Sequence, residues 1–84
     1  MNINGEKKVA VIAIIVSDEA AAPKVNEILH DAREFIIGRL GLPYKERAVS
    51  VISVVLDAPQ EFINALSGKL GMIKGVSSKV LTTK

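Results

Sequence analysis

The chain has 84 residues, 49% of them hydrophobic, and its eleven basic and nine acidic residues give a net charge of +2. This length accommodates one domain and is too short for two, because a self-sufficient core usually needs on the order of 100 residues. The sequence contains no cysteine, which excludes disulfides, thiolate metal sites and thiol nucleophiles.

The distribution of charges and apolar runs limits the partners that we expect. Basic residues are scattered along the chain, so no direct contact with nucleic acid is expected. The longest apolar run, 9–16, has eight residues, whereas a membrane-crossing helix needs roughly 20. The N-terminus lacks the apolar core of a signal peptide. We therefore expect a cytoplasmic protein with no membrane partner, with one domain over residues 1–84, of which 1–6 form a flexible tail.

The first predicted element is a strand over residues 7–17, which is rich in β-branched side chains. Both of its faces are apolar, since Val9, Val11, Ala13 and Ile15 alternate with Ala10, Ile12, Ile14 and Val16. Ser17 or Asp18 is expected to cap a helix of about four turns with Pro23 in its first turn. The predicted buried stripe of this helix is Val25, Ile28, Leu29, Ala32 and Phe35.

Two further strands are predicted in the middle of the chain. The second covers residues 35–40 and is expected to break at 41–44, where glycine and proline interrupt regular pairing. It should therefore lie at a sheet edge. The third covers residues 49–56 and is again apolar on both faces.

A second helix and a last strand complete the predicted elements. Asp57 or Ala58 is expected to cap the helix, with Pro59 at its first position and Gly71 as its C-terminal cap. Its predicted buried stripe is Phe62, Ile63, Leu66 and Leu70. Gly75 is then expected to turn the chain into a strand over residues 77–82.

This order of elements predicts an α+β fold, a ferredoxin-like βαββαβ two-layer sandwich with an antiparallel sheet in the order 4-1-3-2. Both helices should lie on one sheet face, so the other apolar face of the central strands would meet water. We therefore expect a homo-oligomer, a dimer or a tetramer. Gly68 favours close packing, because glycine inside a helix costs roughly 1 kcal/mol relative to alanine. The candidate interface and packing residues are Val9, Val11, Val49, Val51 and Gly68.

One predicted hairpin carries the candidate ligand-binding residues, which are Gly38, Arg39, Gly41, Tyr44 and Arg47. Guanidinium groups form planar forks that match carboxylates or phosphates, and glycines let backbone N–H groups approach a ligand. We therefore hypothesise that the hairpin binds a small anion or nucleotide, alone or with a partner subunit. The alternative is a solvated hairpin with structural glycines and salt bridges between subunits.

The remaining polar motifs predict no chemistry. The Ser-Gly-Lys sequence at 67–69 lacks the spaced first glycine of a phosphate-binding loop. His30 is a single imidazole, and a metal site would need copies from other subunits together with Glu27 or Glu34. The carboxylates mostly fall on expected caps and solvated helix faces, and the central strands carry no aromatics for stacking RNA bases. We therefore expect no catalytic residue, no metal and no cofactor, and hence no enzyme.

Three motifs carry a resemblance to a known family: Asn-Glu-Ile-Leu-His at 26–30, Ile-Gly-Arg-Leu-Gly-Leu-Pro-Tyr at 37–44, and Ala-Leu-Ser-Gly-Lys-Leu-Gly at 65–71. Together with Gly75-Val76 before the last strand, they resemble the small regulators of the iron-only hydrogenase system. The resemblance covers nearly the whole chain. It implies an ACT-like fold, similar also to the C-terminal sensor domain of the nickel-responsive repressor, and a regulatory role linked to iron-only hydrogenase.

Two departures limit what this resemblance carries over. ACT amino-acid sensors commonly place glycine after the first strand, where this chain has Ser-Asp-Glu-Ala at 17–20. The nickel sensor uses several histidines and a cysteine, whereas this chain has one histidine and no cysteine. The expected function is a regulatory or sensor module that acts as an oligomer through a small anionic ligand or a protein partner. The alternative is a structural module for oligomerisation or protein interaction that binds no small molecule.

Overall fold

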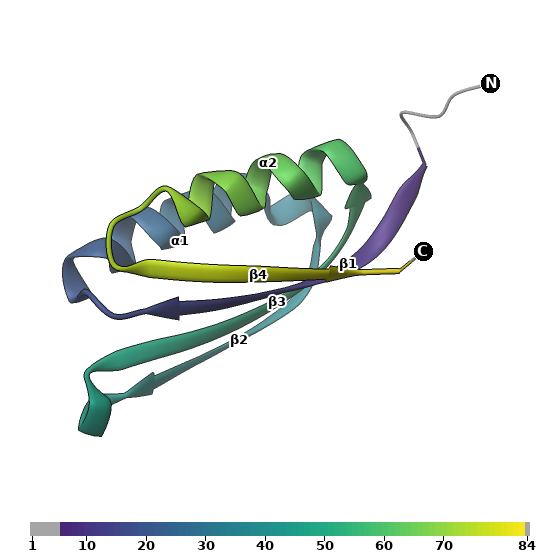
Figure 1. Cartoon of the computed structure of the whole chain (residues 1–84). Helices are drawn as coiled ribbons and strands as arrows, with labels where there is room; N and C mark the ends of the chain where they lie inside the picture. The colour runs from purple at the N-terminus through teal and green to yellow at the C-terminus, as the bar shows by residue number, and fades with distance from the viewer. Residues whose placement is uncertain (1–5, 84) are drawn as a thin grey trace.

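A computed structural model describes residues 6–83 of the chain. Four strands and two α-helices follow one another in the predicted βαββαβ order (Figure 1). They are β1 (Lys7–Val16), α1 (Ala22–Asp31), β2 (Ile36–Tyr44), β3 (Val49–Pro59), α2 (Gln60–Gly71) and β4 (Val76–Thr82). Short 3-10 turns at Glu19–Ala21, Arg33–Phe35 and Lys45–Arg47 connect some of them. The predicted N-terminal tail lies, apart from Glu6, outside the described residues.

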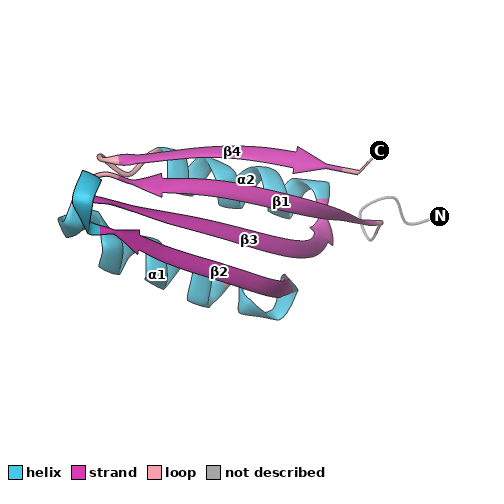
Figure 2. Cartoon of the chain, turned by 90° about the horizontal axis from the view of Figure 1, so that it is seen from below, coloured by secondary structure: helices cyan, strands magenta, loops and turns pink. Residues whose placement is uncertain are grey.

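The four strands form one sheet in the order β2-β3-β1-β4, and every neighbouring pair is antiparallel. Both helices lie against one face of this sheet, and Figure 2 shows the other face with the helices behind it. The predicted ferredoxin-like two-layer sandwich with strand order 4-1-3-2 is therefore confirmed. In the part of the chain that is described, no helix is long and apolar enough to cross a membrane.

The hydrophobic core lies between the helices and the sheet face that they cover. The alternation of β1 and β3 places one apolar face of each strand in this layer, where Ile12, Ile14 and Val54 have no exposed surface. Fully burying such a side chain stabilises the fold by about 1.5–3 kcal/mol. Phe35 and Phe62 pack against the core with their ring centroids 4.4 Å apart. The buried residues of the predicted helix stripes are Val25, Leu29, Ala32, Ile63, Leu66 and Leu70.

The second strand is longer than predicted, and the predicted break at 41–44 is wrong. Pairing with β3 continues through Gly41 and Pro43 to Tyr44. Proline has no N–H for a ladder, but an edge strand has a neighbour on one side only and tolerates it. Phe35 belongs to a 3-10 turn and not to the strand. The predicted edge position of β2 is confirmed.

The boundaries of the helices also differ from the prediction. Asp57 and Ala58 still pair with β1, so β3 extends to Pro59, which is the N-cap of α2 where we had predicted Asp57 or Ala58. At the other end, Gly71 is the last helical residue and Met72 is the C-cap. Asp18 does act as a cap, but of the 3-10 turn before α1, where its Oδ1 accepts a hydrogen bond of 3.0 Å from the Ala20 N–H.

The turn between α2 and β4 depends on Gly75, as predicted. Its φ is +85°, and a Cβ at this position would lie 2.5 Å from the Cβ of Asp18. Its carbonyl oxygen accepts hydrogen bonds from the Ser17 N–H at 2.7 Å and from the Ser17 hydroxyl at 3.2 Å. Only glycine permits both this backbone conformation and this close approach. The turn therefore ties the start of β4 to the end of β1.

Candidate functional site

The sheet face that the helices leave uncovered carries many of the exposed large apolar side chains of the described residues. Its strands contribute Val9, Val11, Ala13 and Ile15 from β1, Gly38, Leu40, Leu42 and Tyr44 from β2, Val49, Val51, Ser53 and Val55 from β3, and Ser77, Lys79 and Leu81 from β4. We call this set the open face. Several of its large side chains are well exposed, including Leu81 at 73% and Leu40 at 68%.

The open face carries little charge. The ladder registers align Leu42, Val51 and Ile15 across three strands, and Val55, Val11 and Leu81 across another three. Lys79 lies on the edge strand β4, and Lys7 of β1 and Asp57 of β3, the partner of Val9, share this face at its far end. The row between these two groups contains Ala13, Ser53 and Lys79 and is more polar.

An irregularity at the start of β2 decides which side chains face the helices. Ile36 pairs with Leu56 and Gly38 pairs with Val55, so Ile37 is an extra residue in the strand. Such a bulge changes the alternation of the side chains by one position. As a result, Arg39 and its alternate neighbours point toward the helix layer, while Gly38 and its alternate neighbours belong to the open face.

A cavity of about 250 Å³ lies between α1 and β2 on the helix side of the sheet. We call it the α1–β2 groove. It exists because the β2 positions beneath it are Gly41, which has no side chain, and Pro43, which is short. The groove is lined by Val16, Ala22, Asn26, Arg39, Gly41, Leu42, Pro43, Ser50 and Ile52.

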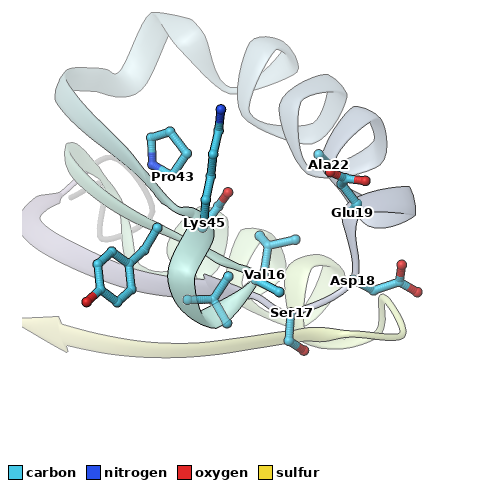
Figure 3. Close-up of a pocket in the computed structure, with 11 residues that line it drawn as sticks. Val16, Ser17, Asp18, Glu19, Ala22, Pro43 and Lys45 are labelled. Carbon is cyan, nitrogen blue, oxygen red and sulfur yellow. The ribbon is translucent and has the colours of Figure 1, made fainter.

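A second cavity of about 350 Å³ adjoins the groove and shares Val16, Ala22, Pro43 and Ser50 with it. Figure 3 shows this second cavity, with Pro43 and Lys45 on the side of β2 and Glu19 and Ala22 on the side of α1. Asp18 and Glu19 also line it, whereas no acidic residue lines the groove itself. The two cavities therefore differ in charge.

Arg39 is the one charged residue among those that line the groove. One of its terminal nitrogens donates a hydrogen bond of 3.1 Å to the Asn26 side-chain oxygen on α1. This bond joins the strand to the helix and orients the guanidinium toward α1. Since a guanidinium has five N–H donors, the others can serve an anion.

The structure brings together some of the predicted ligand-binding residues and separates others. Arg39 and Gly41 both line the groove. Gly38 lies on the open face, and Tyr44 lies there too, at the edge where it also lines the second cavity. Arg47 is in the 3-10 turn between β2 and β3. Asn26 and Ser50 belong to the groove and were missed, because no local motif links residues that come together only across the helix and the sheet.

The predicted interface residues also fall on two surfaces. Val9, Val11, Val49 and Val51 lie together on the open face. Gly68 is exposed on α2, and no heavy atom in the described part of the chain lies within 4 Å of a Cβ built there. Its close-packing role therefore stays a prediction for a contact between chains.

The described residues offer little for metal binding. Among residues 6–83, no group of three or more His, Asp or Glu side chains is arranged to hold a metal ion. His30 is exposed on α1, and its carbonyl oxygen accepts a hydrogen bond from Arg33. Its side chain has the surroundings of an ordinary surface residue.

Comparisons with known proteins agree with the predicted resemblance. An uncharacterized protein of Thermotoga maritima, TM1266, has a solved structure that superimposes with a TM-score of 0.90 at 41% identity, covering 94% of this chain and 100% of that one. A formyltetrahydrofolate deformylase from Pseudomonas putida (TM-score 0.63, 11% identity, 87% of this chain and 28% of that one) shares the fold alone. The same is true of a homoserine dehydrogenase from Thiobacillus denitrificans (0.62, 17%, 98% and 18%).

None of the curated proteins matches the sequence. A family profile does match it, over residues 8–80, and that profile is described as "TM1266-like: Iron-only hydrogenase system regulator, putative". The matched residues include both central strands, both helices and the β2–β3 hairpin. The chain belongs to this TM1266-like family.

Proposed function

We propose that this chain is a non-catalytic regulatory module of the iron-only hydrogenase system, and that it acts as a homo-oligomer through a small ligand or a protein partner. Family membership supplies the context, since the family is described as one of regulators of that system. The observation that carries the proposal is the open face, which presents exposed apolar side chains from all four strands, most of them from β1, β2 and β3.

The size of the open face supports a second copy of the chain as its partner. Four strands about 4.8 Å apart, with seven residues rising about 3.3 Å each, make a surface of about 20 by 25 Å. With side chains standing on it, such a surface is comparable to the roughly 800 Å² that each partner contributes to a standard interface. A net charge of +2 is too small to keep two copies apart.

The composition of the face supports the same partner. On its two central strands, Ile15 and Val51 are paired across β1 and β3 and are 46% and 39% exposed. Apolar surface removed from water contributes about 25 cal/mol per Å². Two copies packed face to face would therefore bury the apolar surface that the helices leave uncovered.

A second candidate function is a structural assembly module that binds no small molecule. The open face favours it, because that surface alone would be sufficient for assembly. The two candidates differ in ligand linkage: a sensor must gain stability as its ligand is added, and its melting temperature must rise with ligand concentration. A melting temperature unchanged by any candidate metabolite, with assembly intact, favours the structural module.

The experiment that tests the proposal compares Ile15→Lys with Met72→Lys by sedimentation velocity at micromolar concentration. Ile15 lies on a central strand of the open face, whereas Met72 is an apolar residue, 87% exposed, at the end of α2. We expect the unchanged protein and Met72→Lys to be oligomers and Ile15→Lys to be a folded monomer. A monomeric unchanged protein, or an Ile15→Lys variant that still assembles, would contradict the proposal.

The link to hydrogenase is tested in a host that carries both the chain and an iron-only hydrogenase. Replacing the chromosomal copy with Ile15→Lys is expected to alter hydrogenase activity as much as deleting it, whereas Met72→Lys is expected to leave that activity unchanged. If deletion itself has no effect on the hydrogenase, the regulatory proposal fails while the assembly result stands.

A further inference from the structure

Gly41 has no explanation within the chain. In the described residues, positive φ values occur only at Ala48 and Gly75, so the backbone at Gly41 is one that any residue adopts. No described heavy atom lies within 4 Å of a Cβ built on it. Glycine in a strand weakens the strand, and its presence marks a place where a ligand or another backbone approaches closely. The fold itself therefore does not require glycine at this position.

The missing side chain at Gly41 keeps the α1–β2 groove open. Gly41 pairs with Ile52 of β3, whose side chain is 8% exposed and belongs to the core. On the same side of β2, Arg39 precedes it and Pro43 follows it. A side chain at this position would project into the cavity of about 250 Å³, and its Cβ would meet open space.

The lining of the groove defines the chemistry of what it can hold. Val16, Ala22, Pro43 and Ile52 make most of it apolar, and the half-buried Ser50 adds a hydroxyl. The charge at one end comes from the Arg39 guanidinium, which Asn26 holds in place. The neighbouring cavity is lined by the carboxylates of Asp18 and Glu19 and by one ammonium group, that of Lys45, so it attracts an anion less than the Arg39 end does. An anion is therefore favoured at the Arg39 end, with an apolar body extending away from it.

We propose that the α1–β2 groove binds a small organic carboxylate, with its carboxylate on Arg39 and its apolar body over Gly41, between Pro43 and Ala22. The volume has room for about eight water-sized atoms, taking about 30 Å³ for each. Hexanoate has this size and shape. The inference rests on the proposed function in one respect: the carboxylate would be the small ligand through which the regulatory module acts. We place the whole site in one chain, and the proposal includes binding without assembly.

The test is a titration with hexanoate, followed through backbone amide chemical shifts, with hexylamine and hexanol as probes of the same length. We expect hexanoate to shift the amides of Arg39, Gly41 and Ser50, and the two other probes to bind at least tenfold more weakly. Gly41→Val should weaken hexanoate binding at least tenfold by filling the groove, and Arg39→Gln should do so by removing the charge. The melting temperature of Gly41→Val should equal or exceed that of the unchanged protein.

Gly38→Val is the matched control, because Gly38 lies on the same strand, has the same open space around a built Cβ and belongs to the open face. It should bind hexanoate as the unchanged protein does. Hexanoate shifts confined to the open face, equal binding of hexylamine, or full binding by Gly41→Val would each overturn the proposal.

The same titration on the monomeric Ile15→Lys variant separates this inference from the proposed assembly. Undiminished hexanoate binding by that monomer supports a site complete in one chain. Loss of binding in a monomer that keeps its fold would overturn such a site. An assembled protein that binds no hexanoate would overturn the groove proposal and leave the assembly proposal intact.

Discussion

The two faces of the sheet have nearly the same composition and very different surroundings. Ile14 and Ile15 are neighbours in β1, yet Ile14 has no exposed surface beneath the helices and Ile15 is 46% exposed on the open face. The same contrast holds in β3 between Val54, which is fully buried, and Val51, which is 39% exposed. Apolar composition alone therefore does not tell which face forms the core of a two-layer domain. It shows instead that the chain carries one more apolar surface than its own helices can cover.

The comparison is tested most directly by truncating the two neighbours in β1. We expect Ile14→Ala to lower the free energy of unfolding by about 2–5 kcal/mol, because it leaves a cavity in a packed core. Ile15→Ala should cost the isolated chain about 1 kcal/mol or less, because its side chain is already half exposed. Urea denaturation over a dilution series measures both. The loss in Ile15→Ala should grow with protein concentration if the open face is an interface. Equal losses at high dilution would contradict the assignment of the two faces.

Substitutions at Gly75 test how far the turn between α2 and β4 stabilises the helix-covered side of the sheet. Gly75→Ala is expected to cost about 1–3 kcal/mol for the positive φ alone, and more for the contact of 2.5 Å with the Asp18 Cβ. Gly71→Ala is the matched control, because its new Cβ would meet only the Ser78 hydroxyl, at an ordinary 3.9 Å. Thermal unfolding should show a large loss for Gly75→Ala and no loss, or a gain of up to about 1 kcal/mol, for Gly71→Ala. Similar losses in both variants would argue against the geometry of this turn.

The smallest expected effect lies at the β2–β3 hairpin, away from the covered layer. Ala48 has a φ of 54° in the left-handed region, which costs a residue with a Cβ roughly 1–2 kcal/mol. Ala48→Gly should therefore raise the free energy of unfolding by about 0.5–1 kcal/mol after the entropy of glycine is subtracted. Ala65→Gly, on the exposed face of α2, should lower it by about 1 kcal/mol. A loss in Ala48→Gly, measured by urea denaturation, would refute the strain at this position.

The topology could be predicted from the sequence because the spacing of the apolar residues clearly distinguishes strands from helices. Residues 9–16 alternate on both faces, and the helix stripe at Val25 and Leu29 has helical spacing, so element types and strand order followed from connection rules. The length of β2 could not be predicted in the same way. Pro43 reads as a break from local chemistry alone, and only its place at the edge of the sheet makes it compatible with pairing.

The candidate site was accessible to prediction only in part. The residue types of Arg39 and Gly41 indicated an anion site on the hairpin, and the structure places both in one groove. Their separation from Gly38 and Tyr44 follows from the alternation of the strand, but which of the two sets faces the helices depends on the extra residue at Ile37, and a bulge has no distinct signal in a run of apolar residues. Ser50 could not be linked to them, because a serine in a strand is equally common on a solvated face.

The bulge at Ile37 also affects which changes in chain length β2 can tolerate. Ile37 is 64% exposed, and removing it would leave Ile36 followed directly by Gly38, which restores simple alternation with every later side chain on its present face. Removing any single residue between Arg39 and Pro43 would instead exchange the faces of the residues on one side of the gap. Among relatives of this chain, natural deletions in the strand should therefore fall at this one position, where the extra residue can be lost over evolution without moving either surface.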